Sequence, residues 1–292
     1  IGLMPGDPID LMISADPRIT SADAARLKAL FGLDRPLHER YLNWLGHAIV
    51  GDFGFSRLYG QPVFDVLLPH LTSTLLLMGT SLLLALMLAL PAGILAALRP
   101  GSLLDASLNL AAFAAFSLPS FWLALLLIII FAVELGWLPA GGVASVGGGD
   151  LLDRLRHLIL PVVTLTLLTS GIFLRFTRAA LLEALREDYV RTARAKGCSM
   201  LAVVLRHALP NAMIPIITVL ALHFGTLLSG ALVVETVFAY HGMGKLIYDA
   251  ILGNDYNLAL AGLMLATFLT LFANLLADLL YLRLDPRIRE GI

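Results

Sequence analysis

Long uncharged stretches dominate the hydrophobic pattern of this chain. A helix that crosses the hydrocarbon core of a membrane needs about 20 apolar residues, and five runs of about that length occur. They cover residues 71–98, 106–133, 158–174, 212–234 (interrupted only by His223) and 256–277. Continuous runs differ from the alternating segments of about ten residues that form β-barrel strands. The pattern therefore predicts an all-α polytopic membrane protein, a helical bundle with five complete spans.

Composition agrees with a membrane protein and argues against other classes. Of the 292 residues, 59% are hydrophobic and 14% are charged, with a mean hydropathy of +0.87, so a soluble globular domain is ruled out. A net charge of −1 offers no positive excess for nucleic acid, which is not expected as a partner. The single cysteine, Cys198, and seven histidines without ligand-pair spacing on one helix predict no metal site.

The distribution of Lys and Arg predicts the orientation of the spans, because basic loops stay cytoplasmic. The 178–211 loop carries six basic residues, whereas residues 235–255 contain only Lys245. We therefore expect the 178–211 loop, residues 99–105 and the C-terminus to be cytoplasmic. Residues 134–157 and residues 1–70 are then expected outside, so the chain divides into an external segment, 1–70, and a transmembrane domain, 71–292.

If residues 1–70 lie outside, a preceding segment of the protein must bring them across the membrane. The chain opens with Ile-Gly-Leu-Met followed by the turn-forming residues 5–8, which reads as the outer end of an earlier span. We expect a sixth, N-terminal span in the full-length protein. A cleaved secretory signal is the alternative.

The external segment shows two short amphipathic patterns. Thr20 and Asp23 resemble a capping box for a helix that ends at Gly32. A second helix is predicted after Pro36, with its apolar positions spaced i, i+4, i+7, i+8 and i+11: Leu37, Tyr41, Trp44, Leu45 and Ala48. These helices either cap the bundle by packing or form a docking surface for a soluble partner.

The 178–211 loop is long and is itself patterned as two helices. The first is predicted from the shared face of Leu182, Leu185, Tyr189 and Ala193, with a weak Glu187–Arg191 surface pair. Gly197 is expected to break it. Ser199 then caps a second helix with the apolar stripe Leu201, Val204, Leu205 and Ala208, which Pro210 is expected to terminate. The apolar faces either lie back on the bundle or enter the groove of a cytoplasmic protein.

The sequence around Gly197 resembles the coupling loop, or EAA loop, of ATP-binding-cassette importer permeases. In that pattern Glu-Ala-Ala precedes a glycine and Ile-x-Leu-Pro follows it. Arg191 and Thr192 stand in place of the Glu and the first Ala, and His207 stands in place of Ile. The resemblance implies an ATPase-coupling site formed by Arg191, Thr192, Ala193, Gly197, Cys198, Ser199, Met200, Leu201, His207, Leu209 and Pro210.

Further motifs resemble the B-type subunits of the dipeptide, oligopeptide, glutathione and nickel branch. They are MPGDP (4–8), FGLDRPL (31–37), GDFGFS (51–56), LPSFW (118–122), GWLPA (136–140), HLILP (157–161), DYVRTARAKG (188–197), VETVF (234–238) and LDPRIR (284–289). The branch usually has Trp-Pro-Gly where this chain has Tyr240-His241-Gly242. Members begin with one more span, in agreement with the charge argument.

The resemblance implies a permease of the bacterial cytoplasmic membrane with several partners. These are a homologous second permease, two ATPase subunits, an extracytoplasmic solute-binding protein, a peptide-like solute and membrane lipid. The chain contains no Gly-x-x-x-x-Gly-Lys-Ser/Thr phosphate loop. We therefore expect it to be no enzyme and to hold no cofactor, with ATP and Mg bound by the ATPase subunits.

Polar residues within the spans are candidates for the translocation path, because ionisable groups in a membrane usually face protein or water. They are His223, Ser229 and Asp278. Each also has a structural interpretation, as an interface histidine, a small residue for helix packing and a helix-end carboxylate. Pro91, Pro119 and Pro161 are candidate bends.

Two questions about function stay open at this level. Di- and oligopeptides are the favoured solutes, with glutathione or a nickel chelate as alternatives in the same branch. An ion-coupled secondary transporter is the alternative from another class, although such proteins usually place several carboxylates or broken helices at the midplane.

Overall fold

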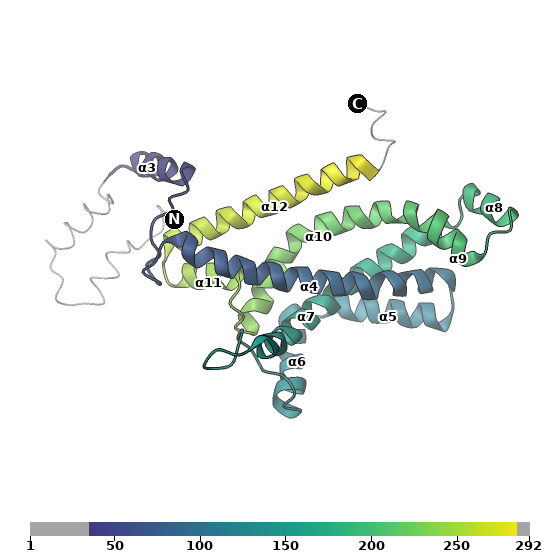
Figure 1. Ribbon diagram of the computed structural model, residues 1–292, viewed down its shortest axis with the longest axis horizontal. Helices are drawn as coiled ribbons and strands as arrows, with labels where there is room; N and C mark the ends of the chain where they lie inside the picture. The colour runs from purple at the N-terminus through teal and green to yellow at the C-terminus, as the bar shows by residue number, and fades with distance from the viewer. Residues whose placement is uncertain (1–34, 285–292) are drawn as a thin grey trace. The chain divides into compact units, whose positions relative to one another are not determined.

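Figure 1 shows the computed structural model of this chain, which describes residues 35–284 apart from the side chains of residues 37, 40, 221–230, 277, 278 and 280–284. Within this range the chain is helical and has no β-strand beyond one isolated bridge between Phe55 and Pro62. The elements are α3 (Leu37–Ile49), α4 (Val63–Leu98), α5 (Leu103–Ser117), α6 (Ser120–Leu127), the π-helix η1 (Ile128–Glu134), α7 (Leu151–Ala184), α8 (Asp188–Ala195), α9 (Met200–Val203), the π-helix η2 (Val204–Ala208), α10 (Leu209–Val237), α11 (Met243–Leu252) and α12 (Tyr256–Leu284). The predicted all-α fold is confirmed.

Four of the five predicted apolar runs each lie within one long helix. Residues 71–98 fall in α4, 158–174 in α7, 212–234 in α10 and 256–277 in α12. Among the described residues, four helical stretches are long and apolar enough to cross a membrane, and a bent pair makes up to five. The bent pair is the fifth predicted run, 106–133.

The run 106–133 is broken rather than straight. The helical stretches Leu103–Ser117 and Ser120–Glu134 meet at an angle of 102°. Leu118 and Pro119 between them are extended, with ψ of 131° and 136°. A proline disfavours helical geometry in the preceding residue, which explains a break at this point. By contrast, α4 continues through Pro91 and α7 continues through Pro161.

The described chain forms two compact units, residues 35–69 with 246–264 and residues 70–245 with 265–284. In the first unit, the ring of Trp44 on α3 meets Phe53 at 6.4 Å, and Phe53 meets Phe64 at 5.3 Å. The helix predicted after Pro36 is present as α3, Leu37–Ile49. The predicted helix that ends at Gly32 lies outside the described residues.

A buried aspartate organises the polar contacts of the first unit. Asp255 accepts hydrogen bonds from the Ser56 hydroxyl at 2.5 Å and from the backbone N–H of Leu58 at 3.0 Å. Its other oxygen accepts the N–H of Leu258 at 3.2 Å, in the first turn of α12. Asp255 thus caps α12 and also accepts hydrogen bonds from the segment that precedes α4. These bonds offset the cost of burying its carboxylate.

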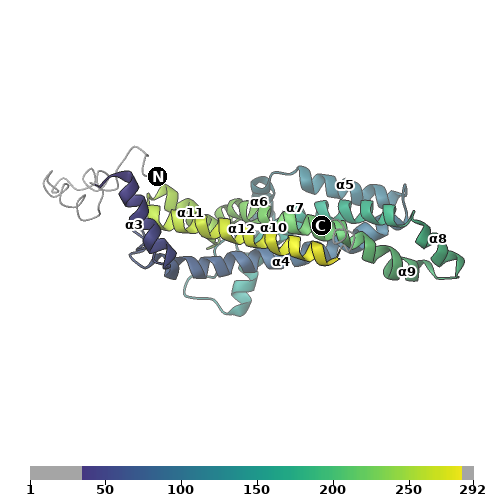
Figure 2. The ribbon, with the colours of Figure 1, turned by 90° about the horizontal axis from the view of Figure 1, so that it is seen from above.

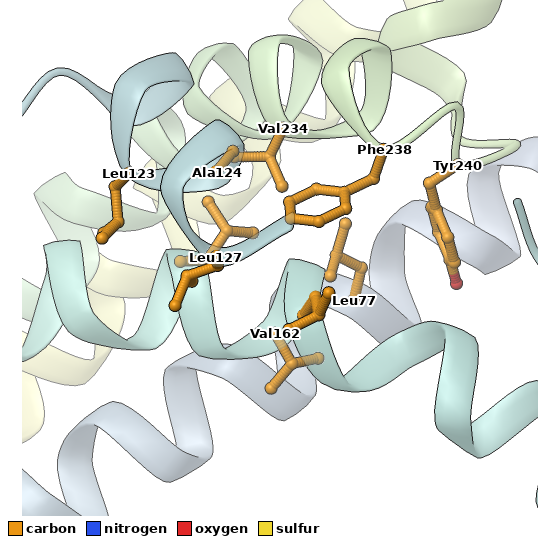
Figure 3. Close-up of a cluster of buried hydrophobic side chains, with 10 residues drawn as sticks. Leu77, Leu123, Ala124, Leu127, Val162, Val234, Phe238 and Tyr240 are labelled. Carbon is orange, nitrogen blue, oxygen red and sulfur yellow. The ribbon is translucent and has the colours of Figure 1, made fainter. Parts of the chain in front are cut away.

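The second unit is built around α7, the most buried of the candidate spans. Figures 1 and 2 show α5 alongside α4 and α7, with α8 and α9 together at one end of these helices. Away from that end, a cluster of buried side chains joins α4, α6, α7 and α10 (Figure 3). It contains Leu77, Leu123, Ala124, Leu127, Leu160, Val162, Leu165, Val234, Phe238 and Tyr240.

Two glycines let α7 and its neighbours approach closely. A Cβ at Gly171 of α7 would lie 2.6 Å from the carbonyl oxygen of Ala112 on α5. A Cβ at Gly93 of α4 would lie 2.7 Å from the Cβ of Thr177. Small residues permit such backbone approach between helices in membranes.

We predict that Gly171→Ala lowers the free energy of unfolding by about 1–3 kcal/mol, because the added methyl group meets backbone rather than a movable side chain. The matched control is Gly79→Ala in α4, where an added Cβ meets nothing within 4 Å. Denaturant unfolding of the detergent-purified protein measures both. Equal stability of the two variants would contradict this packing.

Candidate functional site: the 178–211 loop and its supports

The glycine of the 178–211 loop ends a helix with a defined turn. Gly197 has φ +82°, its N–H donates to the carbonyl of Arg194 at 2.9 Å, and the N–H of Cys198 donates to that of Ala193 at 3.2 Å. This pair of bonds and the left-handed residue define a Schellman motif. The Ser199 hydroxyl then accepts the N–H of Ala202 at 3.3 Å as the cap of α9. The predicted break and cap are both confirmed.

The first predicted helix of the loop is wrong in its extent. Residues 182–193 do not form one helix, because α7 ends at Ala184 and α8 begins at Asp188. Glu187 is extended, with ψ 150°, so it cannot hold the i, i+4 spacing to Arg191. Arg191 instead pairs with Asp188 at 3.3 Å. The bend brings Val190 into the cluster described below, and burial of this apolar side chain favours it.

The predicted end at Pro210 is also wrong. α9 continues through η2 into α10, and Pro210 lies in the first turn of α10. Pro210 has no backbone N–H to donate. It lies just after the π-helix η2, whose hydrogen bonds run to the fifth preceding residue and whose turn is therefore wider than that of an α-helix. The loop is therefore joined to α10 by helical backbone from Met200 onward.

One face of the loop packs on the ends of the bundle helices. Ala97 of α4 and Leu181 of α7 lie in a cluster with buried residues of the loop. The cluster comprises Ala97, Leu181, Ala184, Val190, Ala193, Val203, Val204, Ala208 and Ala212. Of the predicted stripe, Val204 and Ala208 therefore point inward, as the packing interpretation requires.

The other face of the loop presents apolar side chains to the surroundings. Leu201 is 68% exposed, Leu205 52% and Met200 40%. Arg194 lies over this patch, with its Nη2 3.1 Å from the sulfur of Met200. The packing alternative is thus confirmed for one face of the loop, and docking of the exposed face to a cytoplasmic protein stays a prediction.

The remaining predicted coupling residues have ordinary surroundings. Thr192 is exposed and donates its hydroxyl to the Asp188 carbonyl at 3.0 Å. Cys198 is exposed, Arg191 carries the ion pair above, and His207 and Leu209 are half-buried. Of the predicted path residues, His223 and Ser229 fall on α10 and Asp278 on α12, and their side chains lie outside the described residues.

A buried glutamate beside Gly242 was missed by sequence reasoning. Glu235, near the end of α10, is fully buried and accepts the Thr74 hydroxyl at 2.6 Å and the Lys245 N–H at 3.0 Å. Thr74 in turn accepts the Met243 N–H at 2.7 Å. A Cβ at Gly242 would clash with the Glu235 carboxyl. A charged residue at the end of an apolar run, followed by two nearby glycines, was the available signal.

Tyr240 lies beside this group in the turn after α10. Its hydroxyl donates to the Ser73 carbonyl at 3.4 Å. Burial, with a further contribution from the Glu235 carboxyl, raises the pKa of Tyr240 to about 12. The phenol therefore remains neutral at physiological pH and serves as a hydrogen-bond donor.

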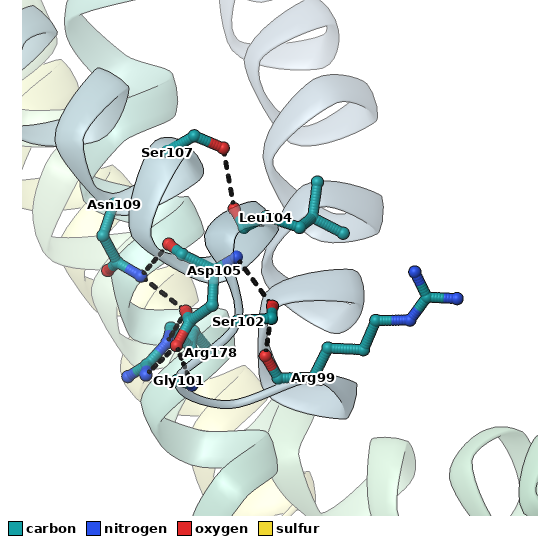
Figure 4. Close-up of polar contacts among 8 residues, drawn as sticks. All are labelled: Arg99, Gly101, Ser102, Leu104, Asp105, Ser107, Asn109 and Arg178. Carbon is teal, nitrogen blue, oxygen red and sulfur yellow. Dashed lines mark hydrogen bonds and ion pairs between the residues drawn. The ribbon is translucent and has the colours of Figure 1, made fainter.

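A second missed group joins α5 to α7. Asp105 accepts two hydrogen bonds from the guanidinium of Arg178 and one from the amide of Asn109 (Figure 4). One turn earlier on α7, Arg175 lies over the ring of Phe113 at 4.3 Å. Sequence reasoning had placed Arg178 only as the start of the loop. The partner 73 positions away carried no local signal.

Residues of the described chain bring no three potential metal ligands (His, Cys, Asp or Glu) together. What they provide instead is a loop with one packed and one exposed face, joined to α10 by continuous helical backbone. Comparison with known proteins then decides the family. Residues 89–290 match the family described as "Binding-protein-dependent transport system inner membrane component". The chain belongs to this family.

Curated relatives extend the match over nearly the whole chain. The oligopeptide transport system permease protein AppB of Bacillus subtilis is 41% identical over 286 residues, covering 97% of this chain and 90% of the relative. The di/tripeptide permease protein DppB of Pseudomonas aeruginosa is 40% identical, covering 99% and 92%. The glutathione permease protein GsiC of Escherichia coli is 39% identical, covering 99% and 91%. The peptide-importer resemblance seen in the motifs is confirmed.

Solved structures agree on the fold. Two crystal forms of the MetNI methionine ABC transporter, described as inward-facing, match with TM-scores of 0.60 and 0.61 at 20% identity. They cover 75% and 76% of this chain, and 96% and 97% of the matched chains. The fold is thus that of an ABC importer permease, and the chain is a multi-pass component of the inner membrane.

We predict that Thr74→Val destabilises this permease by about 1–3 kcal/mol, because the change removes one hydrogen-bond donor from the buried Glu235 carboxyl and the acceptor of the Met243 N–H without altering shape. Thr80→Val on the same helix is the control, since the Thr80 hydroxyl bonds carbonyls of its own helix, Leu76 at 2.7 Å and Leu77 at 3.1 Å. Thermal unfolding of the purified protein distinguishes them. A Thr74→Val variant as stable as Thr80→Val would contradict the proposed importance of the Glu235 contacts.

Proposed function

We propose that this chain is a permease subunit of an ATP-driven importer of di- or oligopeptides that a binding protein delivers. Two relatives carry the proposal. They are about 40% identical to this chain, match it almost end to end, and are named for oligopeptide and for di/tripeptide transport. The GsiC relative supports glutathione as the alternative within the same branch. Nickel is the weaker alternative, since the described residues bring no three potential metal ligands together.

The partners follow from this assignment. A homologous second permease completes the transmembrane path, and two ATPase subunits bind ATP and Mg on the cytoplasmic side. The basic 178–211 loop faces those subunits, because Lys- and Arg-rich loops stay inside. Residues 134–157 and the external segment then face the binding protein. This chain breaks no bond itself, and the ATPase subunits hydrolyse the ATP.

The loop is suited to act as a lever between motor and spans. Its open face offers Met200, Leu201 and Leu205 to a groove on an ATPase subunit, with Arg194 at the margin. Its packed face contacts α4 and α7. Its second half is continuous with α10. A displacement of the loop by closing ATPase subunits therefore moves three spans together as a rigid body.

The function is tested by uptake into proteoliposomes that contain this chain, its second permease, the ATPase subunits and the binding protein. We expect labelled dipeptide or oligopeptide to accumulate only with ATP and to stop with vanadate. Uptake that survives vanadate and ATP depletion while an ion gradient is kept would instead identify an ion-coupled secondary transporter. Mass spectrometry of the solute captured by the binding protein distinguishes peptide from glutathione or a nickel chelate.

The turn at Gly197 gives a second prediction. A Cβ there meets nothing within 4 Å, so the cost of Gly197→Leu is the left-handed backbone, about 1–2 kcal/mol, and not a clash. We expect Gly197→Leu to insert and assemble normally but to transport several-fold less solute per ATP hydrolysed, because α8 and α9 lose their fixed angle. Gly197→Asn, which tolerates this conformation, should stay within twofold of the parent. Equal solute-to-ATP ratios for the parent and Gly197→Leu would refute the lever.

A further inference from the structure

An ion pair joins α5 to α7 at the first residue of the 178–211 loop. Arg178 donates from Nε to Oδ1 of Asp105 at 2.6 Å and from Nη2 to Oδ2 at 2.7 Å (Figure 4). The side chains are 27% and 6% exposed, so the pair is largely withdrawn from solvent. Two parallel charge-assisted bonds fix the relative orientation of the two side chains as well as their distance.

The carboxylate of Asp105 is also tied to its own end of α5. It accepts the N–H of Gly101 at 2.9 Å and the side-chain amide of Asn109 at 2.7 Å. The Ser102 hydroxyl, as the cap of α5, accepts the Asp105 N–H at 3.2 Å. Four donors therefore converge on one carboxylate. The α4–α5 turn, the start of α5 and Arg178 of α7 are held together through it.

A second contact fixes α5 against α7 further along. Gly171 approaches the Ala112 carbonyl so closely that a Cβ would collide with it. Ala112 follows Asp105 by seven positions and Gly171 precedes Arg178 by seven, so the helices run antiparallel and the two contacts lie two turns apart, about 10 Å. Two fixed points prevent α5 from sliding along α7 or swinging away from it.

The ion pair lies between the buried apolar contacts of the loop and the rest of α5. Beyond Arg178, α7 continues without a break to Ala184. Leu181 and Ala184 in this stretch are buried with Val190 and Ala193 of the loop. A displacement of the loop therefore reaches Arg178 through close-packed apolar side chains, which have little room to deform.

We propose that the Asp105–Arg178 ion pair is the positioning link that carries movement of the 178–211 loop from α7 into α5, an inference that rests on the function proposed above. With the link in place, α5 moves together with α7. The first joint in the chain is then the 102° break after α5, at Leu118 and Pro119. Without the link, the loop still moves α7, but α5 no longer follows.

The test is Arg178→Lys in the reconstituted importer, measured as solute transported per ATP hydrolysed. Lysine keeps the charge but cannot form the two-pronged contact. We expect ATP hydrolysis and the amount of assembled complex to stay within twofold, while solute per ATP falls at least fivefold. A merely structural role would reduce assembly and leave the ratio in the assembled complexes unchanged, which would overturn the proposal.

The control is Arg175→Lys, one turn away on the same helix. Arg175 contacts Phe113 of α5 through its cationic group, and lysine retains a cation for the ring. We expect the ratio of solute to ATP to stay within twofold. A fall as large as that of Arg178→Lys would show that any change on this face uncouples transport, which would overturn the specific role of the ion pair.

A rescue experiment covers the case in which Arg178→Lys fails to assemble. In a Cys198→Ser background, whose own solute-to-ATP ratio is measured as the reference, Asp105→Cys and Arg178→Cys together remove the ion pair. A short bis-methanethiosulfonate reagent then bridges the two positions, because each cysteine thiol forms a disulfide with it and displaces a methanesulfinate. We expect a low solute-to-ATP ratio before bridging, recovery after it, and loss again on reduction. No recovery would contradict the link. Failure of the parent complex to couple ATP to uptake at all would instead refute the proposed function.

Discussion

Burial of a few small apolar side chains holds the 178–211 loop against the bundle, and the proposed mechanism depends on that contact. Ala97, Leu181, Val190 and Ala193 leave little space between the loop and the ends of α4 and α7. Close-packed interiors shift as blocks rather than deform. A loop that rested loosely on the helix ends would absorb a push. We propose that this loop transmits the push instead, because its other half is helically continuous with α10.

Fully paired carboxylates complement this apolar contact within each unit. Asp255 caps α12 in the first unit, and Glu235 and Asp105 join distant segments in the second. Each accepts donors from at least two parts of the chain that are far apart in sequence. An unpaired carboxylate at such buried positions would be costly. These groups therefore fix how the segments that they join are positioned, while the apolar faces supply most of the attraction.

Local signals in the sequence predicted local features of this structure but did not predict the contacts between segments that are far apart in the sequence. Hydrophobic run length located the long helices, Gly197 and Ser199 located the turn and the cap, and Pro119 marked a bend. The break at residues 185–187 escaped prediction because burial of Val190 outweighs the helical pattern. The pairing of Asp105 with Arg178 escaped it because nothing near either residue specifies the other.

A cross-linking measurement tests the central claim, that a separate ATPase drives this chain through the open face of the loop. A photoreactive amino acid is placed at Leu201, which is 68% exposed, and in a parallel strain at Val146, which is also exposed. Irradiation of intact cells is followed by mass spectrometry of the adducts. The account predicts capture of a nucleotide-hydrolysing subunit from Leu201 and not from Val146. Adducts from Leu201 that never contain such a subunit would contradict it.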